Sequence, residues 1–389
     1  MIFKFHRGAW AEKEYAARAE NEKAASASKR HNARVMKIIA ICVAAVCVIV
    51  SLFVTTGCGV DDDENCINVF NWGEYIDVDL LTRFEEETGI TVNYTTVSTC
   101  EEMYAKIKCG GVSYDVVVPS DYMVSRMIEE GMVDEINWDN VPNAKYIDEE
   151  HLNPEYDPEG KYSVPYQWGC VAIIYNKDMV DEEDLGSWDI LWNEKYKGQI
   201  LMFDNSRDAI GVALKKLGYS YNTTDESQIR EAAELLKKQK PLVQAYVMDQ
   251  IFDKMENEEA AIATYYVGDY YLMLGELGDD SDVNLGFYIP EEGSNLYVDA
   301  MCIPSGAQNK EGAEAFINFL LDPEVMAQNT EFICYSTAES AARELLPDEL
   351  TGDAMYPTGD ALKQFETFKN LPQNIRTLYD GLWIQILSS

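Results

Sequence analysis

The chain has 389 residues, 47% of them hydrophobic and 11% aromatic, which is enough for two domains with buried cores. Asp and Glu number 68 against 31 Lys and Arg, giving a formal net charge of -37. This balance argues against nucleic acid or an anionic membrane surface as partner, because phosphate groups are bound by Lys and Arg. It suits a cationic ligand, although most of these carboxylates are expected to be solvated.

The first segment of the chain is typical of an export signal. The basic stretch "KRHNARVMK" precedes the apolar run "IIAICVAAVCVIVSLFV" at residues 38–54, and "TTGCG" follows. A charged region, an apolar region and small residues in this order indicate a secretory signal peptide. The Cys after Thr-Gly resembles the bacterial lipoprotein pattern, in which Cys58 would carry the lipid, although Thr55 stands where lipoproteins usually have Leu. An uncleaved membrane anchor is the alternative.

These signals divide the first part of the chain. We predict an N-terminal basic extension and signal or anchor segment at residues 1–57, with Met36 as a second candidate start. Residues 58–66 are predicted to form a lipid-attached, acidic tether. The body of the protein would then be exported and tethered to the outer face of the cytoplasmic membrane, on its periplasmic or cell-surface side.

From residue 67 onwards, short apolar strands alternate with amphipathic helices, which predicts βαβ units and an α/β fold. In chain order we predict a strand at 67–72, a helix at 77–89, a strand at 90–97, a helix at 100–108, a strand at 114–120, a helix at 121–131, a strand–turn–helix unit at 199–218, a helix at 225–241, a second strand–turn–helix unit at 260–278 and a helix pair at 309–332 split at Pro323.

Aromatic and acidic residues gather in the turns after these strands. They are Trp72, Glu74 and Tyr75, then Ser120, Asp121 and Tyr122, then Asp204, Asn205 and Asp208, then Tyr265, Tyr266 and Asp269, and finally Tyr297 and Asp299. In open α/β sheets ligands bind outside the carboxyl ends of the strands, so these turns are expected to converge. Carboxylates suit ammonium groups, and aromatic faces attract cations within about 6 Å of the ring centroid. The pattern predicts a site for a small organic polycation.

The sequence resembles the polyamine-binding proteins of bacterial ABC importers over residues 67–389. Segments such as "FNWGEYI", "YDVVVPSDYMV" and "PEEGSNLYVDAMCIP" carry the resemblance, in order and at similar spacing. It implies an α/β, two-lobed periplasmic-binding-protein-like fold (type II), with two chain crossings and a ligand cleft between the lobes. Lobe 1 would comprise 67–168 plus 299–342, and lobe 2 would comprise 169–298 plus 343–389. It also implies a monomer without enzymatic activity, cofactor or metal, whose partners are putrescine or spermidine and the permease and ATPase subunits of the importer.

The resemblance carries over to twelve ligand-binding positions. They are Trp72, Glu74, Tyr75, Ser120, Tyr122, Asn205, Asp208, Tyr266, Asp269, Tyr297, Asp299 and Tyr335. Asn205 stands where the spermidine-binding form has a second acid, which removes a partner for the third charge of a triamine. Asp269 matches an acid of putrescine-preferring relatives. Tyr266 and Tyr297 each replace a Trp. We therefore expect putrescine to be slightly favoured over spermidine.

Other functions remain as alternatives. The same fold binds amino acids, oligosaccharides or iron in other proteins; an amino acid would need a cation in the cleft, and only Arg207 is placed for that. A surface adhesin or sensor without transport is a further alternative. A glycan-active enzyme is the least supported, since the acid pair Asp204 and Asp208 is its only sign. With His151 as the sole histidine of the exported part, histidine catalysis is not expected. The cysteines show no C-x-x-C spacing, which leaves disulfide pairing open.

Overall fold

The computed structural model describes residues 65–278, 281–359 and 361–389. Cys58, the apolar run at 38–54 and nearly all of the predicted tether lie outside the described residues. Cys100, Cys109, Cys170, Cys302 and Cys334 are free thiols. Within the described part of the chain, no helix combines the length and the apolar character needed to cross a membrane.

The strands form one mixed sheet with the path β2-β1-β3-β9-β4-β7-β5-β6, while β8 and β10 pair with β4, and β11 pairs with β9. Their bounds are β1 Cys66–Trp72, β2 Thr91–Val97, β3 Val116–Val117, β4 Ser163–Asn176, β5 Ile200–Phe203, β6 Val243–Val247, β7 Ile262–Tyr266, β8 Leu285–Tyr288, β9 Ser294–Cys302, β10 Ser336–Thr337 and β11 Phe365–Glu366. The pairs at each end of the path are parallel, namely β1 with β2 and β3, and β5 with β6 and β7.

Helices cover the sheet and close its two hydrophobic cores. Their bounds are α2 Val78–Thr88, α3 Cys100–Cys109, α4 Asp121–Glu129, α5 Ser206–Lys216, α6 Glu226–Gln239, α7 Ile251–Glu256, α8 Val267–Leu277, α9 Lys310–Leu320, α10 Pro323–Ile333, α11 Ser340–Arg343 and α12 Gln373–Ser388. We call β1–β3 with α2–α4, α9 and α10 the first half, and β5–β8 with α5–α8 and α12 the second half. The first half packs as one set of clusters and the second as another.

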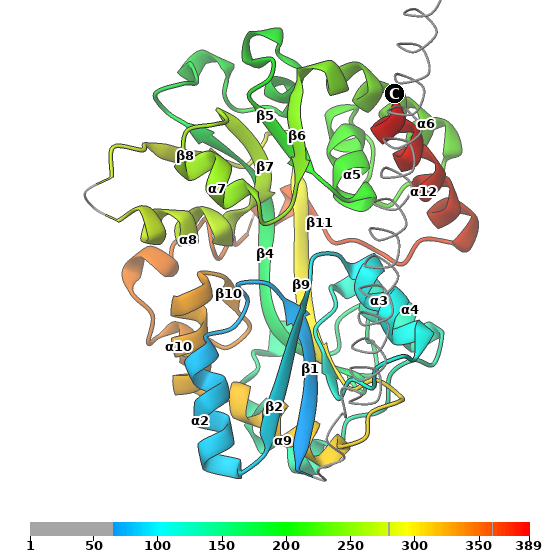
Figure 1. Ribbon diagram of the computed structural model, residues 1–389, viewed down its shortest axis with the longest axis vertical. Helices are drawn as coiled ribbons and strands as arrows, with labels where there is room; N and C mark the ends of the chain where they lie inside the picture. Colours follow the sequence, from blue (N-terminus) through cyan, green and yellow to red (C-terminus); the bar gives the residue numbers. More distant parts are fainter. Residues whose placement is uncertain (1–64, 279–280, 360) are drawn as a thin grey trace, which may run out of the picture. The chain divides into compact units, whose positions relative to one another are not determined.

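Two long strands join the halves. Strands β4 and β9 run side by side, antiparallel, from one half to the other (Figure 1). In β4, Tyr166 belongs to the core of the first half, whereas Ile173 belongs to that of the second. Pro165, which has no N–H for a ladder bond, lies where the register of the β4–β9 pair shifts. The structure thus has the α/β fold that was predicted, with two strands as crossings.

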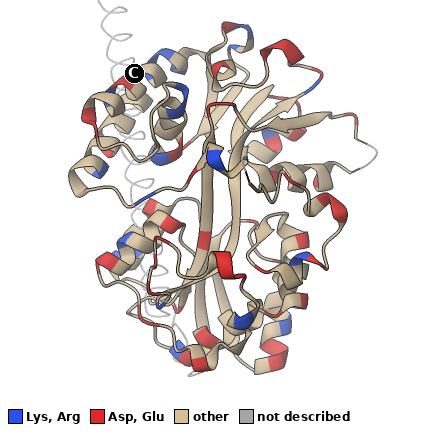
Figure 2. Cartoon of the chain, turned by 180° about the vertical axis from the view of Figure 1, so that it is seen from behind, with Lys and Arg blue, Asp and Glu red and all other residues tan. Residues whose placement is uncertain are grey.

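Local signals account for most of the predicted elements. Asp77 and Thr99 cap α2 and α3 through their side chains, and Gly89 ends α2 in the left-handed region at φ 73°. The sequence did not reveal β4, β9 or α12. The prediction that Tyr297 and Asp299 lie in a turn was wrong, because both lie within β9 and pair with β4. The predicted strand at 114–120 is a regular strand only over Val116–Val117, and Ser120 forms an isolated bridge with Asp299. Acidic residues are spread over both halves rather than gathered on one face, as expected for solvated carboxylates (Figure 2).

Candidate functional site

A cleft of about 100 Å³ lies between the two halves, at the carboxyl ends of the parallel strands. Trp72, Val97 and Tyr266 are the last residues of β1, β2 and β7, and all three line it. The twelve predicted positions line this same cleft: Trp72, Glu74, Tyr75, Ser120, Tyr122, Asn205, Asp208, Tyr266, Asp269, Tyr297, Asp299 and Tyr335. Segments separated by more than 200 residues in the sequence therefore meet at one place, as Tyr75 and Asp299 do.

The cleft is strongly acidic. Its lining contains the carboxylates of Glu74, Glu101, Asp208, Asp249, Asp269 and Asp299. None of the described residues that line it is a Lys, Arg or His. Like charges in a confined space repel one another and favour a bound cation, so the cleft can hold a positively charged molecule far better than a neutral or anionic one.

Asp299 is one of the buried acids of this lining. It projects from β9 and is 5% exposed. The Tyr75 hydroxyl donates to its Oδ2 at 2.8 Å, and the Ser120 hydroxyl donates to its Oδ1 at 2.5 Å. Burial raises the pKa of Asp299 to about 6, while these two hydrogen bonds act in the opposite direction. The carboxylate is therefore oriented by two donors and still lacks a counter-charge.

A second buried carboxylate, Asp269, lies in the first turn of α8. The Tyr335 hydroxyl donates to its Oδ2 at 2.8 Å, and the side chain is 6% exposed. Burial raises its pKa to about 8, and the charge of Asp249 adds to this shift. Asp269 and Asp299 thus share the same arrangement, in which a tyrosine hydroxyl holds an acid that has no cationic partner among the described residues.

The third acidic turn precedes α5, and its residues have different roles. The Asn205 Oδ1 accepts from the backbone N–H of Asp208 at 2.8 Å, so Asn205 is the N-cap of this helix. Burial raises the pKa of Asp208 to about 7, and the charge of Glu101 adds to the effect. The Tyr122 hydroxyl donates to Glu101 at 3.0 Å. Glu101 therefore supplies a carboxylate to this end of the cleft that was not predicted.

Aromatic rings form the wall between these acids. The ring centroids of Tyr75 and Tyr335 are 4.8 Å apart at an interplanar angle of 87°. Tyr297 contacts Tyr266 at 5.1 Å and Tyr335 at 6.4 Å. The indole Nε1 of Trp72 is buried without a hydrogen-bond partner. Aromatic side chains and carboxylates thus line the same cleft.

Several residues at the cleft were missed by sequence analysis. Glu101 and Asp249 follow β2 and β6, so the rule that ligands bind at strand ends would have found them had the tips of these strands been included. Phe368 comes from the irregular segment between β11 and α12, which carries no pattern of its own.

Some residues of the predicted turns do not reach the cleft. Asp121 is 1% exposed, and its Oδ1 accepts from the backbone N–H of Tyr122 at 2.6 Å. Asp204 is solvent-exposed. Arg207 lines a second cavity instead. No group of three or more His, Cys, Asp and Glu side chains within residues 65–278, 281–359 and 361–389 is arranged to hold a metal ion.

Comparisons with known proteins agree on one family. A family model described as bacterial extracellular solute-binding protein matches residues 113–361, and one described as hypothetical lipoprotein (MG045 family) matches residues 35–151. The spermidine/putrescine-binding periplasmic protein of Escherichia coli is 40% identical over 78% of this chain and 87% of its own length. A putrescine-binding periplasmic protein of Pseudomonas aeruginosa is 31% identical over 84% and 93%. The solved structure of a putative spermidine/putrescine ABC transporter from Listeria monocytogenes is 39% identical and superposes with a TM-score of 0.78, covering 83% of this chain and 99% of that one.

Proposed function

This chain belongs to the bacterial extracellular solute-binding proteins, and from that membership we propose that it captures polyamines and delivers them to an ABC importer. Members of this family bind solutes and do not transform them, so the protein is not an enzyme. Asp204, the partner required by the glycan-hydrolysing alternative, lies outside the cleft.

The acidic lining of the cleft carries this proposal. Six carboxylates and several tyrosine rings face one space, which no basic side chain of the described residues enters. An amino acid or another anion would need a cation there for its carboxylate, and Arg207 does not line the cleft. A flexible diamine or triamine satisfies both features, because its ammonium groups pair with the acids and its methylene chain lies against the rings.

We infer that Asp269 and Asp299 are the two main ammonium sites. Each is buried and held by a tyrosine hydroxyl, and the two tyrosines, Tyr335 and Tyr75, contact each other at 4.8 Å. Two such acids along one aromatic wall suit the two charges of putrescine, which we propose is slightly favoured over spermidine. Asn205 supplies an amide where a further carboxylate would favour the third charge of spermidine.

We propose that the halves correspond to two lobes that close over the ligand, with lobe 1 at 67–168 plus 299–342 and lobe 2 at 169–298 plus 343–389. Hinge closure around a ligand is a common motion of such proteins. The likeness of residues 35–151 to a lipoprotein family supports tethering through Cys58. A tethered receptor stays close to its permease, which raises the effective concentration of captured ligand there.

Calorimetric titration with putrescine and with spermidine tests the function directly. We expect saturable binding of both at about micromolar Kd or tighter, which corresponds to about -8 kcal/mol. Glutamate and a neutral disaccharide serve as controls for the other ligand classes and should give no heat. Absence of binding by either polyamine to folded, ligand-free protein would refute the proposal.

Binding should strengthen with pH, because ammonium groups need ionised acids. Asp299 and Asp269 have pKa values raised to about 6 and about 8, so both are largely protonated near pH 5. We expect the putrescine Kd to fall about tenfold or more between about pH 5 and pH 7.

The stability of the ligand-free protein should show the opposite dependence on pH. Because the pKa values of Asp299 and Asp269 are raised by folding, they bind more protons in the folded state than in the unfolded chain, and the stability they contribute falls as pH rises from about 4 to about 8. Titrations and thermal melts at several pH values check both signs; a putrescine Kd independent of pH would contradict the assignment of these acids.

The substitution Asn205→Asp should shift selectivity towards spermidine. Asp caps a helix as well as Asn does, so α5 keeps its cap while the cleft gains a negative charge. We expect spermidine to bind roughly 5- to 10-fold more tightly, because an added ion pair that is partly exposed contributes about 1 kcal/mol. The affinity for putrescine should change less. Parallel titrations of both polyamines measure the ratio. An unchanged ratio would mean that the third charge lies elsewhere, for example at Glu101.

A further inference from the structure

A second cavity of about 90 Å³ lies beside the cleft and, unlike the cleft, has cations in its lining. It shares the side chains of Glu101 and Tyr122 with the cleft. Four cations also line it: Arg126 from α4, Arg207 from α5, Lys369 from the segment before α12 and Arg376 from α12. Glu101 and Asp380 also line it. Two of the cations pair with carboxylates outside the lining, Arg126 with Glu130 at 3.0 Å and Lys369 with Glu155 at 2.6 Å.

Arg207 is the most buried of these cations, being 6% exposed. Its Nη2 donates to the Asn222 Oδ1 at 2.9 Å and to the Lys369 carbonyl at 3.3 Å, but its Nε and Nη1 have no hydrogen-bond partner. Its guanidinium carbon lies 4.5 Å from the centre of the Phe368 ring. No ion pair links Arg207 to a carboxylate of the described residues. A buried charge with two unmatched donors is costly unless an anion completes it.

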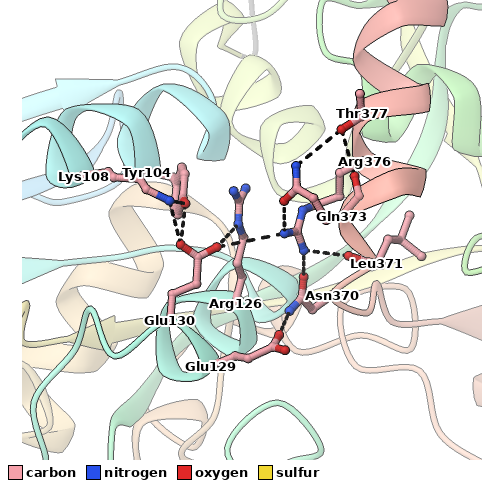
Figure 3. Close-up of polar contacts among 10 residues, drawn as sticks. All are labelled: Tyr104, Lys108, Arg126, Glu129, Glu130, Asn370, Leu371, Gln373, Arg376 and Thr377. Carbon is pink, nitrogen blue, oxygen red and sulfur yellow. Dashed lines mark hydrogen bonds and ion pairs between the residues drawn. The ribbon is translucent and has the colours of Figure 1, made fainter.

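Arg376, from α12, lines the same cavity and has one unmatched donor. Figure 3 shows its guanidinium among residues at the start of α12, such as Gln373, and near Arg126 of α4. It donates to the Asn370 Oδ1, to the Leu371 carbonyl and to the Gln373 Oε1, all at 2.6 Å, and its Nη2 is 4.0 Å from a Glu130 oxygen. Its Nε is buried without a partner. Burial and the positive charge of Arg126 lower the pKa of Arg376, while the charges of Glu130 and Glu129 act in the opposite direction.

Helix ends add to the positive field. Ser206 and Arg207 form the first turn of α5, and Gln373 begins the 16-residue helix α12; all three line the cavity. Pro372, the N-cap of α12, provides no side-chain acceptor for the first N–H groups. Helix N-termini attract oxyanions through their free N–H groups and their dipole. Guanidinium forks and helix ends together are the usual groups that hold phosphate.

We propose that this cavity binds one small tetrahedral oxyanion, phosphate or sulfate, between α4 of the first half and α5 and α12 of the second. The anion would accept from the unmatched donors of Arg207 and Arg376. Because its ligands come from both halves, the bound anion favours the arrangement in which the halves are close. If the proposed polyamine function holds, the anion and the polyamine strengthen each other's binding, since each stabilises that arrangement and coupling is reciprocal.

Inorganic phosphate is the probe for the site itself. The full-length protein, free of polyamine, is titrated with phosphate at constant ionic strength set by chloride, and the titration is followed by calorimetry and by thermal melting. We expect saturable binding at a stoichiometry of about one and a phosphate-dependent rise in melting temperature. Arg207→Gln and Arg376→Gln should each weaken phosphate binding about tenfold or more, since each removes charge-assisted hydrogen bonds. Arg230→Gln, which changes an exposed arginine paired within α6, is the matched control and should bind as the wild type does.

Either of two outcomes would refute the proposed anion site. One is the absence of saturable phosphate binding to the wild type, and the other is equal phosphate affinity of the wild type and Arg376→Gln. Using two arginine variants keeps the test decisive should Arg207→Gln fail to fold. Coupling is tested separately by measuring the putrescine Kd with and without saturating phosphate. A severalfold tighter Kd with phosphate is expected, and an unchanged Kd would refute the coupling alone. A protein that binds phosphate but no polyamine would refute the proposed function and leave the anion site in place.

Discussion

Replacing Asp299 with Asn is expected to weaken the binding of putrescine and spermidine about 100-fold or more. Asn is nearly isosteric, but it brings no charge and turns one oxygen of the pair held by Tyr75 and Ser120 into an amide that donates. Losing one partner of a buried, hydrogen-bonded charge pair costs roughly 2 to 5 kcal/mol, and an ammonium without its carboxylate in a 5% exposed position incurs that penalty. Calorimetric titration of both polyamines measures it.

The same substitution should leave the ligand-free protein intact or more stable near pH 8. Burial raises the pKa of Asp299 to about 6, so above this pH the folded protein holds an unfavourable charge that Asn removes. A loss of binding without a loss of melting temperature therefore separates a binding role from a structural one. Asp139→Asn, at an exposed position, is the matched control for a change of one charge and should retain wild-type affinity. Near-native affinity in Asp299→Asn would remove Asp299 from the binding site.

The acidic cleft could be predicted because it depends on a topological rule and on side-chain chemistry. Carboxyl ends of parallel strands meet at one edge, so the residues after β1 and β3 were expected to converge, as were those after β5 and β7. The two sets run antiparallel to each other, so their carboxyl ends face one another across the cleft. The rule does not tell which side chain of a turn points inward. Asp121 and Ser120 are neighbours, yet Asp121 bonds to the first turn of α4 while Ser120 faces the cleft.

What the sequence could not reveal depends on contacts between distant segments. Strand β4 contains Pro165 and Gly169, which usually argue against a central strand; both pair with β9, and the register of that pair shifts next to Pro165. Phe368 joins the cleft from a segment without periodicity, and its ring is placed by Tyr122 and Tyr221 from both halves. Likewise, the sequence does not show that Arg207 is buried with two donor atoms that lack hydrogen-bond partners.

Adding a methyl group at Gly268 is expected to disrupt the cleft by displacing the ring of Tyr335. A Cβ at this position of α8 would lie 2.5, 2.6 and 2.8 Å from three atoms of the Tyr335 ring, which is closer than carbon atoms can approach. Tyr335 is 6% exposed and packed against Tyr75, so its ring cannot move without strain. We expect Gly268→Ala to break the 2.8 Å bond from Tyr335 to Asp269 and to destabilise the protein by about 1 to 3 kcal/mol.

Polyamine affinity of Gly268→Ala should also fall by about 10- to 100-fold, because a hydrogen bond to a charged group contributes roughly 1.5 to 3 kcal/mol and the Tyr335 ring also forms part of the aromatic wall.

The same helix offers a matched control variant. Gly275 lies two turns further along α8, is exposed, and a Cβ there would meet nothing within 4 Å. Gly275→Ala should therefore raise stability by about 0.5 to 1 kcal/mol through helix propensity and leave binding unchanged. Denaturant unfolding and putrescine titration of the two variants distinguish contact from propensity. Equal behaviour of Gly268→Ala and Gly275→Ala would show that Tyr335 is not held against α8 as described, and the link from Tyr335 to Asp269 would no longer support the ammonium site.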